Sequence, residues 1–166
     1  MFSNRCILLL AVLLSGVFGT LGAVSVAQAV MPVKVYVMPR SCPNPLNVNS
    51  RGVLPVAILG TDSLDVTDIG AATTKIVDGA VAPFRWAWED VATPYNGAFL
   101  EGAFDCSEAG PDGYIDLVLF FDKPEVVAAI GEVSDGEVLQ LTVTGDLWDG
   151  TLIGGYDFVV IKAKGL

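Results

Sequence analysis

Short apolar stretches separated by turn residues run through this chain, and they limit the folds that it can adopt. Residues 33–38 and 139–143 alternate apolar with other side chains, which is typical of a strand with one buried face. Further strands are expected at 53–59, 73–77, 84–88, 114–121 and 158–161. Asp149-Gly150 and Gly154-Gly155 predict turns. About seven short strands with such turns favour an antiparallel β-sandwich, Ig-like or jelly-roll-like.

One long loop and one short helix interrupt the strands. Residues 91–113 are irregular and contain several Gly and Pro residues. Pro124 suits the first helical position and Glu125 suits the positive end of a helix dipole, so at most one short helix is expected, over 124–130. No βαβ alternation and no internal repeat occurs, and residues 30–166 are therefore expected to form a single β-sandwich domain.

The first 29 residues have the features of a secretory signal peptide. Arg5 is followed by the apolar stretch 6–26 and then by Ala27-Gln28-Ala29, whose small residues suit signal peptidase. An uncleaved membrane anchor is the alternative, because about 20 apolar residues can span a bilayer. No basic cluster follows the stretch, so cleavage is expected. The mature chain is then secreted or extracytoplasmic, in the periplasm or at the cell surface, without a membrane span.

The charge balance limits the partners of the mature chain. The sequence has 19 acidic and 9 basic residues, a net charge of −10. Removal of residues 1–29 takes away one basic residue, which leaves 8 − 19 = −11. A surface of this sign repels phosphate backbones and attracts cations, so nucleic acid is not expected as a partner.

Cysteine and histidine counts bear on disulfides and on catalysis. Cys42 and Cys106 remain after loss of Cys6 with the signal peptide. In an exported chain they are expected to form a disulfide, with two buried free thiols as the alternative. The chain has no histidine, which excludes His-based triads and His-ligated zinc. No enzyme activity is expected.

An acidic set lies around the long loop. Asp112 and Asp116 flank Gly113, Asp90 ends the preceding strand, and Asp105 lies within the loop. Calcium takes several oxygen ligands, often from carboxylates on a loop that is bent at glycine. Asp90, Asp105, Asp112 and Asp116 are therefore candidate calcium ligands. The alternative is an Asp-Gly turn that begins a strand.

Aromatic residues also gather near this loop. Tyr95, Phe99 and Phe104 lie within it, where exposed rings could stack on sugars. Ordinary core packing is the alternative. Trp86 and Trp88 share one face of their strand, and we expect both in the core.

The segment 42–62, CPNPLNVNSRGVLPVAILGTD, together with Glu89-Asp90-Val91 and the stretch DGYIDL at 112–117, resembles a known module. This module, IDIKPGS…PVAILGT…EDV…DGxxDL, is found in many exported bacterial proteins, often at the end of larger secreted or surface proteins. The resemblance runs from about Val33 to Ile161. It implies a compact acidic loop similar to calcium loops, although an insertion at 92–111 separates the two matching segments here.

Together these features predict an exported, non-catalytic β-sandwich module with a structural, surface or adhesive role, stabilised by calcium. A carbohydrate-binding module that uses aromatics of the 91–113 loop is the alternative. The partner would be a glycan or a cell-surface polymer.

Overall fold

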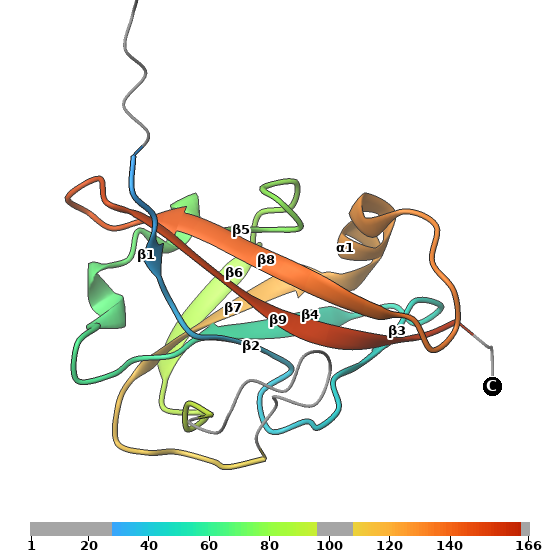
Figure 1. Cartoon of the computed structure of the whole chain (residues 1–166), viewed down its shortest axis with the longest axis horizontal. Helices are drawn as coiled ribbons and strands as arrows, with labels where there is room; N and C mark the ends of the chain where they lie inside the picture. Colours follow the sequence, from blue (N-terminus) through green and yellow to red (C-terminus); the bar gives the residue numbers. More distant parts are fainter. Residues whose placement is uncertain (1–27, 96–107, 164–166) are drawn as a thin grey trace, which may run out of the picture.

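Valine, isoleucine and leucine dominate the strands, and the alternation of their side chains builds two sheets with a shared core. The computed structural model describes residues 28–95 and 108–163. One sheet has the strand order β2-β4-β7-β6, and the other has the order β1-β9-β8-β5 with β3 also paired to β9. Figure 1 shows β8 and β9 crossing in front of β4 and β7. The expected mostly β sandwich is confirmed.

The four-stranded sheet is antiparallel throughout. Its strands are β2 (Val35–Val37), β4 (Val53–Ile58), β7 (Asp116–Asp122) and β6 (Arg85–Glu89). Val56 lies opposite Leu119, which in turn lies opposite Trp86. Strands β4 and β7 hold the centre of the sheet, while β2 and β6 form its two edges.

The five-stranded sheet is mixed, which differs from the antiparallel arrangement expected from the sequence. Its strands are β1 (Met31–Pro32), β3 (Pro45–Asn47), β5 (Lys75–Ile76), β8 (Val138–Asp146) and β9 (Leu152–Lys162). Strands β8 and β5 are antiparallel to their neighbours, but β1 and β3 both pair in parallel with β9. Parallel pairs join segments far apart in the sequence, which local patterns do not reveal.

Gly154 and Gly155 lie inside β9, so the turn expected there is wrong. A Cβ atom at Gly155 would collide with the carbonyl oxygen of Val33, and one at Gly154 would come 3.0 Å from the Val30 side chain. The two glycines therefore let the N-terminal segment pass close to β9. Glycine in a strand often marks such a close approach of another backbone, and not only a turn.

One α-helix, α1 (Lys123–Ile130), agrees with the expected short helix. The Asp122 carboxylate caps it by accepting the Glu125 N–H at 3.1 Å, and it ends at Gly131, whose φ is 83°. Two 3₁₀ turns, η1 (Val66–Asp68) and η2 (Ala71–Thr73), precede β5 and shorten the strand expected at 73–77. No described helix has the length and apolar character needed to span a bilayer.

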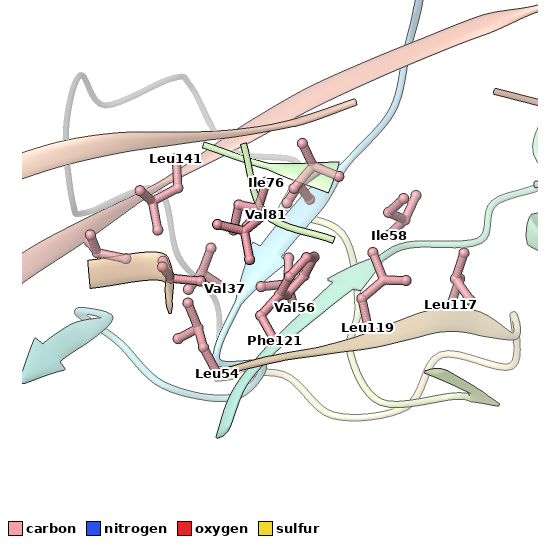
Figure 2. Packing of buried hydrophobic residues seen from close by; sticks show 14 of the residues in the cluster. Val37, Leu54, Val56, Ile58, Ile76, Val81, Leu117, Leu119, Phe121 and Leu141 are labelled. Carbon is pink, nitrogen blue, oxygen red and sulfur yellow. The ribbon is translucent and has the colours of Figure 1, made fainter. Parts of the chain in front are cut away.

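The core lies between the sheets. Figure 2 shows side chains of β4 and β7 meeting Ile76 and Leu141 of the other sheet. The inward residues of β4 and β7 are Leu54, Val56, Ile58, Leu117, Leu119 and Phe121, all fully buried. Truncation of a buried phenylalanine such as Phe121 to alanine costs about 3–5 kcal/mol. This core fixes the strand ends from which the candidate site residues project.

Candidate functional site

Asp116 begins β7 and is completely buried. One carboxylate oxygen, Oδ1, accepts the Gly60 N–H at 3.0 Å, and the other, Oδ2, accepts the N–H groups of Val91 at 2.9 Å and Ala92 at 3.2 Å. Gly60 follows β4, while Val91 and Ala92 follow β6. This one carboxylate therefore joins the chain segments that leave both neighbours of β7.

Gly60 is suited to this position because the chain approaches it closely. A Cβ atom there would collide with the carbonyl oxygen of Ile115, the residue before Asp116. Only glycine leaves room for the backbone contact that brings its N–H to Asp116. Sequence reasoning did not assign this role to Gly60, although it ends the apolar stretch 53–59.

Asp90 and Asp112 organise the turn that leads into β7. Asp90 accepts the N–H groups of Asp112 at 3.0 Å and of Gly113 at 2.7 Å, one on each carboxylate oxygen. Asp112 accepts the N–H of Tyr114 at 3.0 Å, and Gly113 has a φ of 99°. Asp90, Asp112 and Asp116 are called the acidic connection below. Their described contacts are those of an Asp-Gly turn held by carboxylates.

The electrostatics of the acidic connection centre on its buried member. Burial raises the pKa of Asp116 above its ordinary value of 3.8, and the negative charge of Asp90 adds to the rise. Hydrogen bonds from Val91, Gly60 and Ala92 act in the opposite direction, because an N–H donor stabilises the charged carboxylate. Asp90 and Asp116 are thus close enough to repel each other.

The described acidic residues can be compared with the ligand set that calcium needs. Within residues 28–95 and 108–163, no three His, Cys, Asp or Glu side chains are grouped so as to hold a metal ion. Asp105, the fourth candidate ligand, lies outside the described residues. A complete oxygen shell of six to eight ligands would have to draw on groups beyond Asp90, Asp112 and Asp116. Calcium binding at this connection stays a prediction.

A second buried aspartate, Asp157 in β9, was not predicted as a site residue. Its Oδ2 accepts the Val37 N–H of β2 at 2.7 Å and the Asn44 side-chain amide at 2.9 Å. Asn44 also donates to the carbonyl oxygen of Phe158 at 3.0 Å. The signal in the sequence was an acidic residue that alternates with Val159 and Ile161 on the core side of a strand, where a charge needs partners.

A cavity of about 650 Å³ lies beside this aspartate. Three tyrosines line it, Tyr36, Tyr95 and Tyr156, together with Lys34 and Thr142 among others. Its volume falls in the range of small-molecule sites. Of the aromatic residues proposed for sugar contact, Tyr95 lines the cavity, whereas Phe99 and Phe104 lie outside the described residues.

Trp86 and Trp88 were expected in the core, and this expectation is wrong in part. They lie opposite Leu119 and Leu117 and so face the core side of the sheet, but 37% and 47% of their surfaces are exposed. The reason is that β6 is an edge strand. On its other face the Arg85 guanidinium lies 3.9 Å over the Phe120 ring, a cation–π contact.

Cys42 is disulfide-bonded and lies in the Pro-rich turn before β3. Cys106 lies outside the described residues, so the pairing of these two cysteines stays a prediction. Residues 1–27 of the expected signal peptide also lie outside the described residues, so cleavage after Ala29 stays a prediction.

Comparisons with known proteins leave the relationship of this chain open. No family model matches it, and no curated protein matches it. Among solved structures, it is similar to the major subunit of aggregative adherence fimbriae type I from Escherichia coli, with 11% identity and a TM-score of 0.25 over 82% of this chain and 99% of that one. A likeness this weak carries no argument about role. Membership of the exported bacterial module stays a prediction.

Proposed function

We propose that this chain is an exported, non-catalytic β-sandwich module with a structural role at the cell surface or outside the cell. The observation that carries the proposal is the engagement of its acidic residues. The carboxylates of Asp90, Asp116 and Asp157 accept backbone N–H groups from neighbouring segments. Carboxylates used in this way hold strands and turns together, and they are poor candidates for general acids or nucleophiles.

Fractionation and activity assays test this role. We expect the exported protein to begin at Val30, to remain with the cell surface or its extracellular polymer, and to turn over no ester, peptide or glycoside substrate. Hydrolysis that disappears when one carboxylate is changed, with the fold intact, would contradict the proposal. So would recovery of the whole protein from the cytoplasm with residues 1–29 still attached.

Calcium stabilisation is the finer part of this proposal. It is supported by the repulsion between Asp90 and Asp116, which contributes to the raised pKa of Asp116, and by the net charge of the mature chain, 8 − 19 = −11. A cation would relieve that repulsion. At ten times the dissociation constant, calcium would add about 1.4 kcal/mol to the free energy of unfolding.

Thermal melts in calcium and in chelator test this part. The melting temperature should be a few degrees higher with calcium, and Asp112→Asn should remove the difference. This variant should otherwise disturb the fold little, because Asp112 is exposed and its carboxylate accepts one local hydrogen bond, from the Tyr114 N–H. Asp78→Asn, at an exposed residue in the turn after β5 of the other sheet, is the matched control. Equal melting temperatures in both conditions would rule out a stabilising site.

A carbohydrate-binding role is the second candidate. The specific observation is that Tyr95 meets Tyr36 and Tyr156 around the 650 Å³ cavity, since tyrosine rings can stack on sugars and their hydroxyls can bond to sugar hydroxyls. A glycan array should then give a hit that Tyr156→Ala abolishes. Exposed Tyr114 does not line the cavity, and Tyr114→Ala is therefore the matched control. An array without hits would contradict the carbohydrate-binding role and would not affect the proposed structural role.

A further inference from the structure

Strand β6 lies at an edge of the four-stranded sheet as described. Residues Arg85–Glu89 pair with β7 on one side, and within the described part of the chain no strand pairs with the other. Every residue of β6 except Ala87 is exposed, and Ala87 is partly exposed. A free edge presents unpaired N–H and C=O groups and is a template for another strand.

The sequence of β6 is self-complementary around its middle residue. Side chains directly opposite each other in an antiparallel pair lie on the same face of the sheet. The two-fold axis of such a pair must therefore pass through a residue and not between two residues. With the axis at Ala87, Arg85 lies opposite Glu89 of the second copy, and Trp86 lies opposite Trp88 of the second copy.

Other registers lose this match. An axis at Trp86 places Arg85 opposite Ala87, and an axis at Trp88 places Glu89 opposite Ala87. A parallel pair in register places Arg85 beside Arg85. Only the axis at Ala87 sets opposite charges against each other twice on one face and aromatic rings against each other twice on the other, and both kinds of cross-strand pair stabilise a sheet.

We infer that β6 is a self-association strand. Two copies join antiparallel through β6 about a two-fold axis at Ala87, so that two four-stranded sheets become one continuous sheet. Such an interface is isologous, with the same patch on both copies. It covers the exposed parts of Trp86 and Trp88. The inference deepens the proposed structural role, on which it rests, by naming a second copy of this chain as a partner.

Charge exchange tests the pairing in the purified mature chain. Sedimentation velocity over a range of concentrations, at physiological ionic strength, should show a monomer–dimer equilibrium. Arg85→Glu places two like-charged pairs in the interface and should weaken the dimer about tenfold or more. Glu89→Arg should do the same. The double variant Arg85→Glu/Glu89→Arg restores opposite charges and should recover most of the affinity.

Two controls separate the interface from the fold. Lys75→Glu makes the same kind of charge reversal at an exposed residue of β5, and it should leave the dimer unchanged. Arg85 also stacks on Phe120 within its own chain, so each variant is melted before sedimentation. Glu89→Arg leaves that stacking intact and therefore tests the pairing even where Arg85→Glu unfolds the chain.

Three results would overturn the inference: a wild-type chain that is monomeric at all concentrations, a dimer indifferent to Glu89→Arg, or a double variant no better than the single ones. A chain that is monomeric in solution but retained at the cell surface without turnover would refute only the pairing. A chain with substrate turnover would refute the structural role itself. Failure of the inference and failure of the proposed function are therefore distinguishable.

Discussion

The two edge strands of the four-stranded sheet differ in burial: β2 is covered, whereas β6 is exposed. Strand β2 is buried at every residue, with exposures of 4%, 7% and 1% for Val35, Tyr36 and Val37. Its Val37 N–H is taken by the carboxylate of Asp157 from the other sheet. Strand β6 is exposed along its length. Free edges promote association. Among the described residues, the edge at β6 can therefore accept a further strand, whereas the edge at β2 is covered.

Removal of the Asp157 carboxylate should have the largest effect on the closed edge. Asp157→Ala leaves the Val37 N–H and the Asn44 side-chain amide without this acceptor in a buried place, and the free energy of unfolding should fall by about 3 kcal/mol. Urea denaturation measures it. Asp157→Asn keeps one acceptor oxygen and should cost less. A loss below about 0.5 kcal/mol for the alanine variant would mean that the closed edge does not depend on this contact.

Addition of a methyl group at Gly155 should cause the second-largest loss of stability. Gly155→Ala forces β9 away from the Val33 carbonyl, and overpacking of this kind costs about 1–3 kcal/mol. Gly110→Ala is the matched control, because a Cβ atom there meets nothing within 4 Å. Equal midpoints of denaturation for the two variants would show that the segment around Val33 can move away from β9 at little cost in stability.

The open edge should respond less. Trp88→Thr removes a side chain that is 47% exposed and puts a strand-forming residue in its place, so the monomer should lose about 1.5 kcal/mol, half of the loss expected for Asp157→Ala. Dimerisation should weaken in the same variant. A large loss of monomer stability would instead make Trp88 a core residue, as the sequence predicted, and would remove the contrast between the edges.

A pH series provides the smallest effect, and it concerns the connection that follows β6. The pKa of Asp116 is raised in the folded state, so its contribution to stability is fully present below its ordinary value of 3.8 and is lost as pH rises through the folded pKa. The stability of wild type relative to Asp116→Asn should therefore decline as the pH rises above the ordinary value of 3.8. The opposite slope would mean that the amide donors outweigh burial.

Comparison with this variant also isolates Asp116 from other carboxylates. Hydrogen bonds from Thr67 lower the pKa of Asp65, and hydrogen bonds from Thr151 lower that of Asp149. Their contributions are present above the ordinary value and are lost as pH falls, opposite to Asp116. The pH profile of the wild type alone would mix both directions.

Local signals predicted the parts of the fold that depend on local chemistry. The apolar stretch at β4 and the Pro124-Glu125 helix start were found because hydrophobic burial and helix capping act within a few residues. Strand β3 was missed because Pro45 was interpreted as a turn residue, whereas its pairing with Val160 of β9 is non-local. Strand β9 was predicted too short, because Gly154-Gly155 was interpreted as a turn. The local sequence does not indicate that Val33 packs against these glycines.

In the candidate site, too, local features were predicted and non-local contacts were missed. Asp90, Asp112 and Asp116 were named from their spacing, and the structure describes all three in one connection. Their use as acceptors for backbone N–H groups was not predicted, because the Gly60 donor lies 56 residues from Asp116. Exposure of Trp86 and Trp88 was missed for a related reason: alternation identifies the face of a strand but not its position at an edge.

The position of β9 has a consequence for the order in which the chain can fold. This C-terminal strand lies between β8 and the N-terminal strands, with Met31 opposite Ile153 and Leu46 opposite Ile161. Contacts of such high sequence separation make folding slow, because a long loop must close before they form. The five-stranded sheet cannot be completed until β9 has been synthesised. A chain threaded across a membrane from its N-terminus would therefore emerge with β1 and β3 still unpaired, and would complete its fold only on the far side.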